Sequence, residues 1–200
     1  MNNEIIINGQ KAIKIVTVIN YVNITFGDYN TKQIPGTTLE KPSIDIQLIE
    51  SDKTYNYYKV LYSWKYLGLD APLIVPNNDT VYEPNFINIE ATKETINIMW
   101  DKYEQNQNNS FYITSIYPLY FKGETMDGII KKDVRIERVT IIENNKYKMT
   151  LNFHVNGITN LVSSKEFNVM LSLYKDYSCT KYLGYINVKI KMYVTSGPGE

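Results

Sequence analysis

The side chains that most often carry catalysis are scarce in this chain, which has one histidine and one cysteine in 200 residues. His154 occupies a polar position in an alternating, strand-like segment, which favours a surface or cross-strand histidine over a general base. Cys179 lies between Ser178 and Thr180 in a polar, turn-like stretch, and no neighbouring cation in the sequence marks it as a reactive thiolate. We interpret it as a structural or incidental thiol, and a single cysteine forms no intramolecular disulfide.

Other catalytic arrangements are equally sparse. The segment Ser163-Ser164-Lys165 is loop-like, and a Ser–Lys dyad there is a distant alternative. The sequence has no dinucleotide-binding glycine motif, phosphate loop, nucleophile elbow, paired-cysteine zinc spacing or EF-hand loop. Its 21 acidic residues make some carboxylate pairs inevitable, so such pairs carry no information about hydrolysis. We therefore predict no enzyme and no catalytic, metal or cofactor site, with a small acidic hydrolase as a weaker alternative.

The charge balance excludes several classes of partner. Lys and Arg number 21, as do Asp and Glu, so the formal net charge is zero and neither a nucleic-acid groove nor a polybasic membrane patch is indicated. Hydrophobic residues make up 44% of the chain and charged residues 21%, which is typical of a globular protein rather than a disordered or fibrous one. No apolar run is long enough for a membrane span, and the first residues lack a signal-peptide pattern. We expect no membrane anchor.

Tyrosine is the unusual entry in the composition, with 18 residues. Exposed aromatic side chains mark partner surfaces or stacking platforms for sugars and bases. The absence of a basic groove weakens the interpretation as a platform for bases. Self-association, ordinary packing and glycan stacking all remain open.

The dominant pattern along the chain is apolar–polar alternation, the period of a β-strand. It is clearest over 147–155 and 186–194, and shorter matches occur at 44–48, 111–113 and 167–173. Each pattern predicts a strand with one buried face. The sequence is therefore mostly β.

One helix is expected after the first of these strands. Asp52 can cap its first turn, Tyr55, Tyr58 and Tyr62 recur at helical spacing, and Gly68 can end it. The segment 96–100 has both helical and alternating spacing, and we favour a strand because a polar hairpin tip at 105–109 follows it.

The stretch after the expected helix is a linker. Residues 69–85 contain Pro72, Pro76 and Pro84, which disfavour regular structure through most of it. From 66 to 92 the chain has four acidic residues and no Lys or Arg, a local charge of −4 in a neutral chain. We favour a solvated loop without a further role over a functional surface as the explanation.

The order of these elements resembles the tail-tube protein family of contractile phages and related injection systems. A strand at 43–48 leads into an aromatic helix that ends at Trp64, and a later strand that begins at Phe111 ends at Tyr117-Pro118. The strand 133–141 follows, and the resemblance spans residues 10–145. It rests on Trp64, on the Tyr117-Pro118 pair and on the spacing between them.

The resemblance implies a tail-tube-like β-sandwich or barrel with one packed α-helix. Residues 1–145 would form this domain, 146–195 a C-terminal β extension of it, and 196–200 a flexible tail. The extension goes beyond the usual tube fold, so a baseplate, initiator or terminator protein fits as well as the main tube. Long strands with open edges agree with this, because such edges are an aggregation hazard for a monomer and pairing removes it.

The resemblance also implies partners. Copies would form a hexameric ring around a channel, together with other tail or baseplate proteins, in a virion assembled in the host cytoplasm, with DNA as transient cargo. Asp70, Asp79 and Glu83 are candidate interface or lumen residues, since a negative wall repels the DNA backbone. The alternative function is a glycan- or receptor-binding β-sandwich of a tail fibre or adhesin, which clustered exposed aromatics around one pocket would favour.

Overall fold

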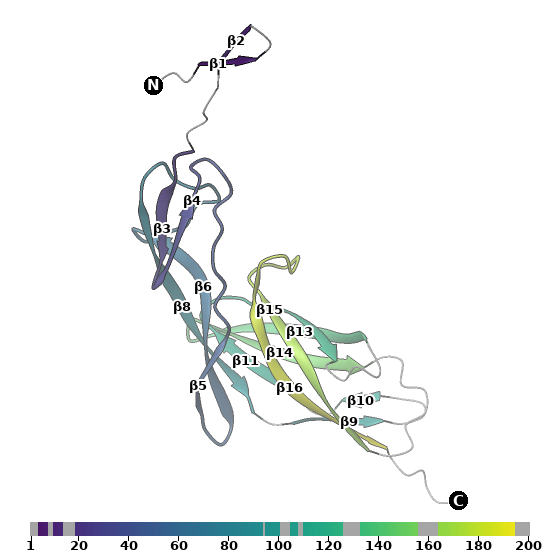
Figure 1. Cartoon of the computed structure of the whole chain (residues 1–200). Helices are drawn as coiled ribbons and strands as arrows, with labels where there is room; N and C mark the ends of the chain where they lie inside the picture. Colours follow the sequence, from purple (N-terminus) through teal and green to yellow (C-terminus); the bar gives the residue numbers. More distant parts are fainter. Residues whose placement is uncertain are drawn as a thin grey trace, which may run out of the picture. The chain divides into compact units, whose positions relative to one another are not determined.

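In the residues that it describes, the computed structural model consists of strands and connecting loops (Figure 1). It describes residues 4–7, 10–13, 19–93, 95–100, 105–107, 110–125, 133–155 and 164–194. The strands are, in chain order, β1 (Glu4–Ile7), β2 (Gln10–Ile13), β3 (Val22–Phe26), β4 (Tyr29–Gln33), β5 (Gln47–Ser51), β6 (Tyr55–Tyr66), β7 (Leu69–Asp70), β8 (Thr80–Thr92), β9 (Ile96–Trp100), β10 (Gln105–Gln107), β11 (Phe111–Ser115), β12 (Tyr120–Thr125), β13 (Asp133–Glu143), β14 (Lys146–Val155), β15 (Lys165–Tyr174) and β16 (Tyr182–Val194).

The chain divides into two compact units. The first comprises residues 1–41 and 65–83, and the second comprises 42–64 and 84–200. The strands of segment 146–195, namely β14, β15 and β16, belong to the second unit together with β9 to β13. They pair directly with these earlier strands, β14 with β11 and β13, and β15 with β12.

The second unit is built on a curled sheet. Its strand order is β10-β9-β16-β15-β12-β13-β14-β11-β8, with β6 next to β8 and β5 next to β6. The neighbours with a resolved register are antiparallel, except that β9 runs parallel to β16. This confirms the strands expected from alternation at 147–155 and 186–194.

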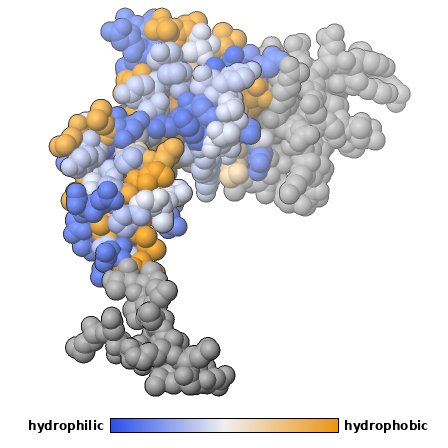
Figure 2. Space-filling view, turned by 90° about the horizontal axis from the view of Figure 1, so that it is seen from above, coloured by the Kyte–Doolittle hydropathy of each residue, from blue (hydrophilic) through white to orange (hydrophobic). Residues whose placement is uncertain are grey.

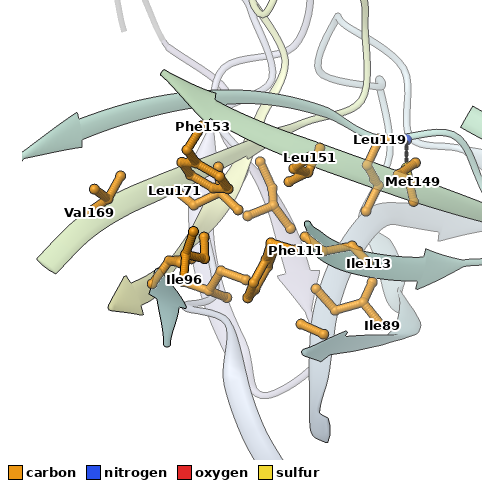
Figure 3. Packing of buried hydrophobic residues seen from close by; sticks show 14 of the residues in the cluster. Ile89, Ile96, Phe111, Ile113, Leu119, Met149, Leu151, Phe153, Val169 and Leu171 are labelled. Carbon is orange, nitrogen blue, oxygen red and sulfur yellow. Dashed lines mark hydrogen bonds between the residues drawn. The ribbon is translucent and has the colours of Figure 1, made fainter. Parts of the chain in front are cut away.

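One face of this sheet forms the core of the second unit (Figure 3). Met149, Leu151 and Phe153 point into it from β14, with polar residues between them in the sequence. The ring of Phe153 meets the ring of Phe111 edge to face, with centroids 6.2 Å apart. Because side chains alternate between the two faces of a strand, every second side chain of β14 is buried, and it packs against strands that are distant in the sequence.

The first unit has its own small core. The β3–β4 hairpin pairs with the beginning of β8, parallel to it, from Ile24 to Phe26. The rings of Phe26 and Tyr82 stack with centroids 5.1 Å apart, and both side chains are almost fully buried. The segment around Leu39 and Val75 adds two further buried residues.

The expected helix over residues 55–66 is wrong, because this segment is strand β6. Val60 and Trp64 are buried, and Tyr58 and Tyr62 pack against the core, so the even-numbered residues face inward. Tyr58 and Tyr62 are four residues apart, a spacing that fits both a helical turn and two strand repeats. Aromatic residues favour the pleated surface, and pairing with β5 and β8 decides between the two.

The residues expected to begin and end that helix are turn residues. Asp52 lies in the β5–β6 hairpin, where its backbone N–H donates to the Tyr55 carbonyl. Leu67 and Gly68 have φ values of 49° and 80°, which is the two-residue turn that joins β6 to β7.

Three further expectations concern the middle of the chain. Residues 96–100 form a strand, as favoured from the sequence. Gln105, expected in a hairpin tip, begins β10 instead. The linker at 69–85 is less irregular than expected, because β7 lies at its start and β8 begins at Thr80 and continues through Pro84. The described residues contain no helix with the length and hydropathy needed to cross a membrane.

Candidate assembly edge and binding hollow

The outermost strands of the two units carry features that discourage pairing with another chain. Strand β10 is only three residues long. Strand β4 has the polar sequence Tyr-Asn-Thr-Lys-Gln. Strand β5 has an irregular register between Leu48 and Glu50. Short length, an edge lysine and a bulge are the devices by which proteins protect sheet edges.

Strand β13 lacks these features along most of its length. It pairs regularly with β14 from Val134 to Glu143. On its other side, its register with β12 covers only Asp133 and Val134. The two strands then diverge, and within the described residues no strand pairs with the second edge of β13 from residue 135 onward.

Arg138 bridges the beginning of this gap. Its guanidinium donates a hydrogen bond to the carbonyl of Leu119. The same group lies 4.1 Å from the centre of the Tyr120 ring, a cation–π contact. The open part of the edge therefore begins after Arg138 and runs to Glu143.

The open part of β13 is hydrophobic. Val139, Ile141 and Ile142 are 57%, 52% and 69% exposed. Branched side chains on an unprotected strand edge are a template for pairing with another strand. Figure 2 shows hydrophobic residues interspersed with hydrophilic ones on the face drawn.

The residues that carry the family resemblance all lie in the second unit. Trp64 is buried on β6, and its indole N–H donates to the carbonyl of Pro42 at 3.0 Å. The ring of Tyr117 stacks on Tyr62, with centroids 4.5 Å apart and planes 13° from parallel. Tyr117 and Pro118 thus follow β11 close to the strand that carries Trp64. The resemblance placed a helix where β6 lies, so these residues have packing roles within a different local fold.

The three acidic residues predicted for an interface or lumen lie in the first unit, and two of them have local partners. Asp70 forms an ion pair with Lys65 across the β6–β7 hairpin, at 2.9 Å. Asp79 accepts hydrogen bonds from the backbone and side-chain nitrogens of Asn23, at 2.7 and 2.8 Å, and these lower the pKa of Asp79. Glu83 is exposed on β8. Asp70 and Asp79 are therefore bound to different elements.

The residues considered for catalysis lie partly outside the described residues. The backbone of His154 lies in β14, and its side chain is outside the described set, as is Ser163. Cys179 has a φ of 52° in a turn. In that turn the carboxylate of Asp176 accepts hydrogen bonds from the backbone of Thr180 and Lys181. No group of three or more metal-ligating side chains occurs in the described part of the chain.

A hollow of about 430 Å³ lies on the outer face of the second unit's sheet. It opens where β11, which pairs with β8 from Ile89 to Ala91, leaves that strand at Ser115. Its lining includes Phe86, Asn88, Glu90, Thr114, Ile116 and Lys146. Sequence reasoning did not find this site. The signal was the alternation of Phe86, Asn88 and Glu90 with the buried residues Ile87, Ile89 and Ala91.

Tyr57, at one side of the hollow, is fixed by a hydrogen bond. Its hydroxyl donates to the carboxylate of Asp52 at 2.9 Å, and this bond raises the pKa of Tyr57 to about 12. The backbone N–H groups of Tyr55 and Thr54 donate to the same carboxylate at 2.7 Å and, with Tyr57, lower the pKa of Asp52.

We expect Asp52→Asn to return the pKa of Tyr57 toward the ordinary value of 10.0. The wild-type hydrogen bond contributes its full stability below the unfolded pKa of tyrosine, and this contribution is lost as the pH rises through about 12. Carbon-13 NMR of the labelled tyrosine ring, followed against pH, measures both values. The same titration of Tyr177, which is 85% exposed, provides the control. An unchanged Tyr57 titration in the variant would contradict the assignment.

Comparisons with known proteins return no relatives: no family model matches the chain, and no curated protein or solved structure matches it.

Proposed function

We propose that this chain is a structural subunit that joins copies of itself through β13, in a ring of the tail tube or baseplate channel of a contractile phage or related injection system. The observation that carries the proposal is the open, hydrophobic edge of β13 between Val139 and Glu143. The injection-system setting comes from the sequence resemblance at Trp64, Tyr117 and Pro118, without the helix that the resemblance implied, because that segment is strand β6.

Within the described residues, the backbone N–H and C=O groups on one edge of β13 have no strand to pair with from residue 135 onward. A sheet edge presents backbone N–H and C=O groups that another strand can pair with. In β13 these groups are accompanied by exposed Val139 and Ile141, so a pairing strand gains both hydrogen bonds and apolar burial. If β13 pairs with a different strand of the next copy, the interface is heterologous and closes into a ring when the rotation permits.

The chain's part in such a channel is mechanical. Pairing at β13 extends the sheet of the second unit across the subunit boundary and stiffens the wall of the channel. Other tail or baseplate proteins would contact the ends of the ring, and DNA would pass through as cargo.

A pair of lysines tests the edge directly. We expect the double variant Val139→Lys and Ile141→Lys to weaken self-association at least about tenfold, because charged side chains on an edge strand disfavour pairing. Analytical ultracentrifugation over a concentration series measures the effect. Both side chains are already more than half exposed, so the fold should tolerate the change.

Val81→Lys is the matched control. Val81 is 59% exposed, against 57% for Val139, and lies on β8 in the first unit. It adds one positive charge at the same exposure away from β13, so it is compared with the single variant Val139→Lys as well as with the double variant. Association that survives the double variant, or that falls equally in the control, would contradict pairing through this edge.

A further inference from the structure

The hollow beside β8 and β11 holds polar groups that the protein itself does not use. Within the described part of the chain, the side chains of Asn88, Glu90, Thr114 and Lys146 have no hydrogen-bond or ion-pair partner. They converge on one volume of about 430 Å³, which is the size of a small-ligand site. Convergent free donors and acceptors are what a polar ligand requires.

The charged side chains that line the hollow indicate which class of ligand it can bind. Its lining includes one carboxylate, Glu90, and one ammonium group, Lys146. These formal charges cancel. Two further charges lie against lining residues, the ammonium group of Lys59 at Phe86 and the carboxylate of Asp52 at Tyr57, and they cancel as well, so neither an acidic nor a basic ligand is favoured over a neutral one. The amide of Asn88 and the hydroxyl of Thr114 can each donate and accept, as a ligand rich in hydroxyl groups requires.

The hollow also has apolar walls. Phe86 and Ile116 line it, and Ile116 is 49% exposed. The ammonium group of Lys59 lies 4.2 Å from the centre of the Phe86 ring and fixes that ring in place. A sugar ring presents hydroxyl groups at its edge and C–H groups on its faces, which matches this combination of polar and apolar walls.

We propose that this hollow binds a neutral pyranose, alone or as a residue of a longer glycan. The inference is independent of the assembly role of β13, because the hollow and the open edge involve different residues. Glu90 and Asn88 would hold the ring hydroxyls, and Phe86 and Ile116 would contact its C–H groups.

The test compares three sugars that have the same pyranose ring but different charges. The full chain, labelled with nitrogen-15, is titrated with methyl glucopyranoside, with glucuronate and with glucosamine, which are neutral, negative and positive. We expect the neutral sugar to shift the amide signals of residues 86–90 and 114–116, with a dissociation constant of order millimolar. The charged sugars should bind more weakly. Methyl galactopyranoside and methyl mannopyranoside, both neutral, are titrated in the same way.

Two variants and a control complete the test. Glu90→Gln and Asn88→Ala should each weaken binding of the neutral sugar about tenfold, since the first replaces a charged acceptor oxygen with an amide nitrogen and the second removes the amide from the site. Glu124→Gln, on an exposed glutamate of β12, should leave binding unchanged. Amide spectra of the free variants report whether they remain folded. The proposal is overturned if no neutral pyranoside shifts these signals, if a charged sugar binds best, or if folded Glu90→Gln and Asn88→Ala bind like the wild type.

Discussion

Replacing Gly184 with alanine should lower the free energy of unfolding by about 3 kcal/mol, through backbone strain and overpacking together. Gly184 has a φ of 141°, in a region that residues with a Cβ rarely adopt. An added Cβ would also lie 2.5 Å from Cγ1 of Ile46, well inside van der Waals contact. The side chain of Ile46 packs against the core of the second unit, so it has little room to move aside. Chemical denaturation followed by tyrosine fluorescence measures the loss.

Two further variants separate the effect of backbone strain from that of overpacking. Gly36→Ala should cost about 1 kcal/mol, because Gly36 has a φ of 80° but no heavy atom within 4 Å of an added Cβ. Removing the steric partner with Ile46→Ala should make Gly184→Ala less costly than in the wild type, a coupling that a double-mutant cycle measures. Equal costs for Gly184→Ala and Gly36→Ala would contradict the close approach of Ile46.

Truncating Phe153 should have an effect of similar or larger size. Its ring is 1% exposed and meets Phe111 edge to face in the core of the second unit. Phe153→Ala removes most of a buried ring and leaves a cavity, so we expect a loss of about 3–5 kcal/mol in unfolding free energy. Equilibrium denaturation at several concentrations of urea measures it.

Phe153→Leu and Tyr177→Ala provide the comparison. The leucine retains much of the buried volume and should cost less than half as much as the alanine. Tyr177 is 85% exposed, so its truncation should change the unfolding free energy by no more than about 0.5 kcal/mol. A Phe153→Ala loss as small as that of Tyr177→Ala would show that the core is not centred on this ring.

The strands that bury one face were predictable because their pattern has a single explanation. In β14, Met149, Leu151 and Phe153 alternate with polar residues, and only a half-buried strand fits. Strand β6 was not predictable in the same way. Its tyrosines at 58 and 62 fit both periods, and what decides the outcome is pairing with β5 and β8, which local sequence does not contain.

The hollow and the open edge depend on where strands separate. The hollow exists because β11 leaves β8 at Ser115, and the edge exists because β12 leaves β13 after Val134. Neither separation has a local signature. The run Val139-Thr140-Ile141-Ile142 did carry a signal, because continuous branched residues are typical of a strand covered on both faces. In the single chain, Val139 and Ile141 remain exposed. A copy that pairs with β13 would place cross-strand neighbours beside these two side chains and bury part of them.

Electron microscopy of the purified wild-type chain at high concentration tests this claim most directly. If copies complete one another at β13, the images should show rings or stacked rings of uniform diameter with a central channel, and these should disappear when Val139 and Ile141 are lysines. Fields of single, separate particles at every concentration, with and without other tail proteins, would contradict the account.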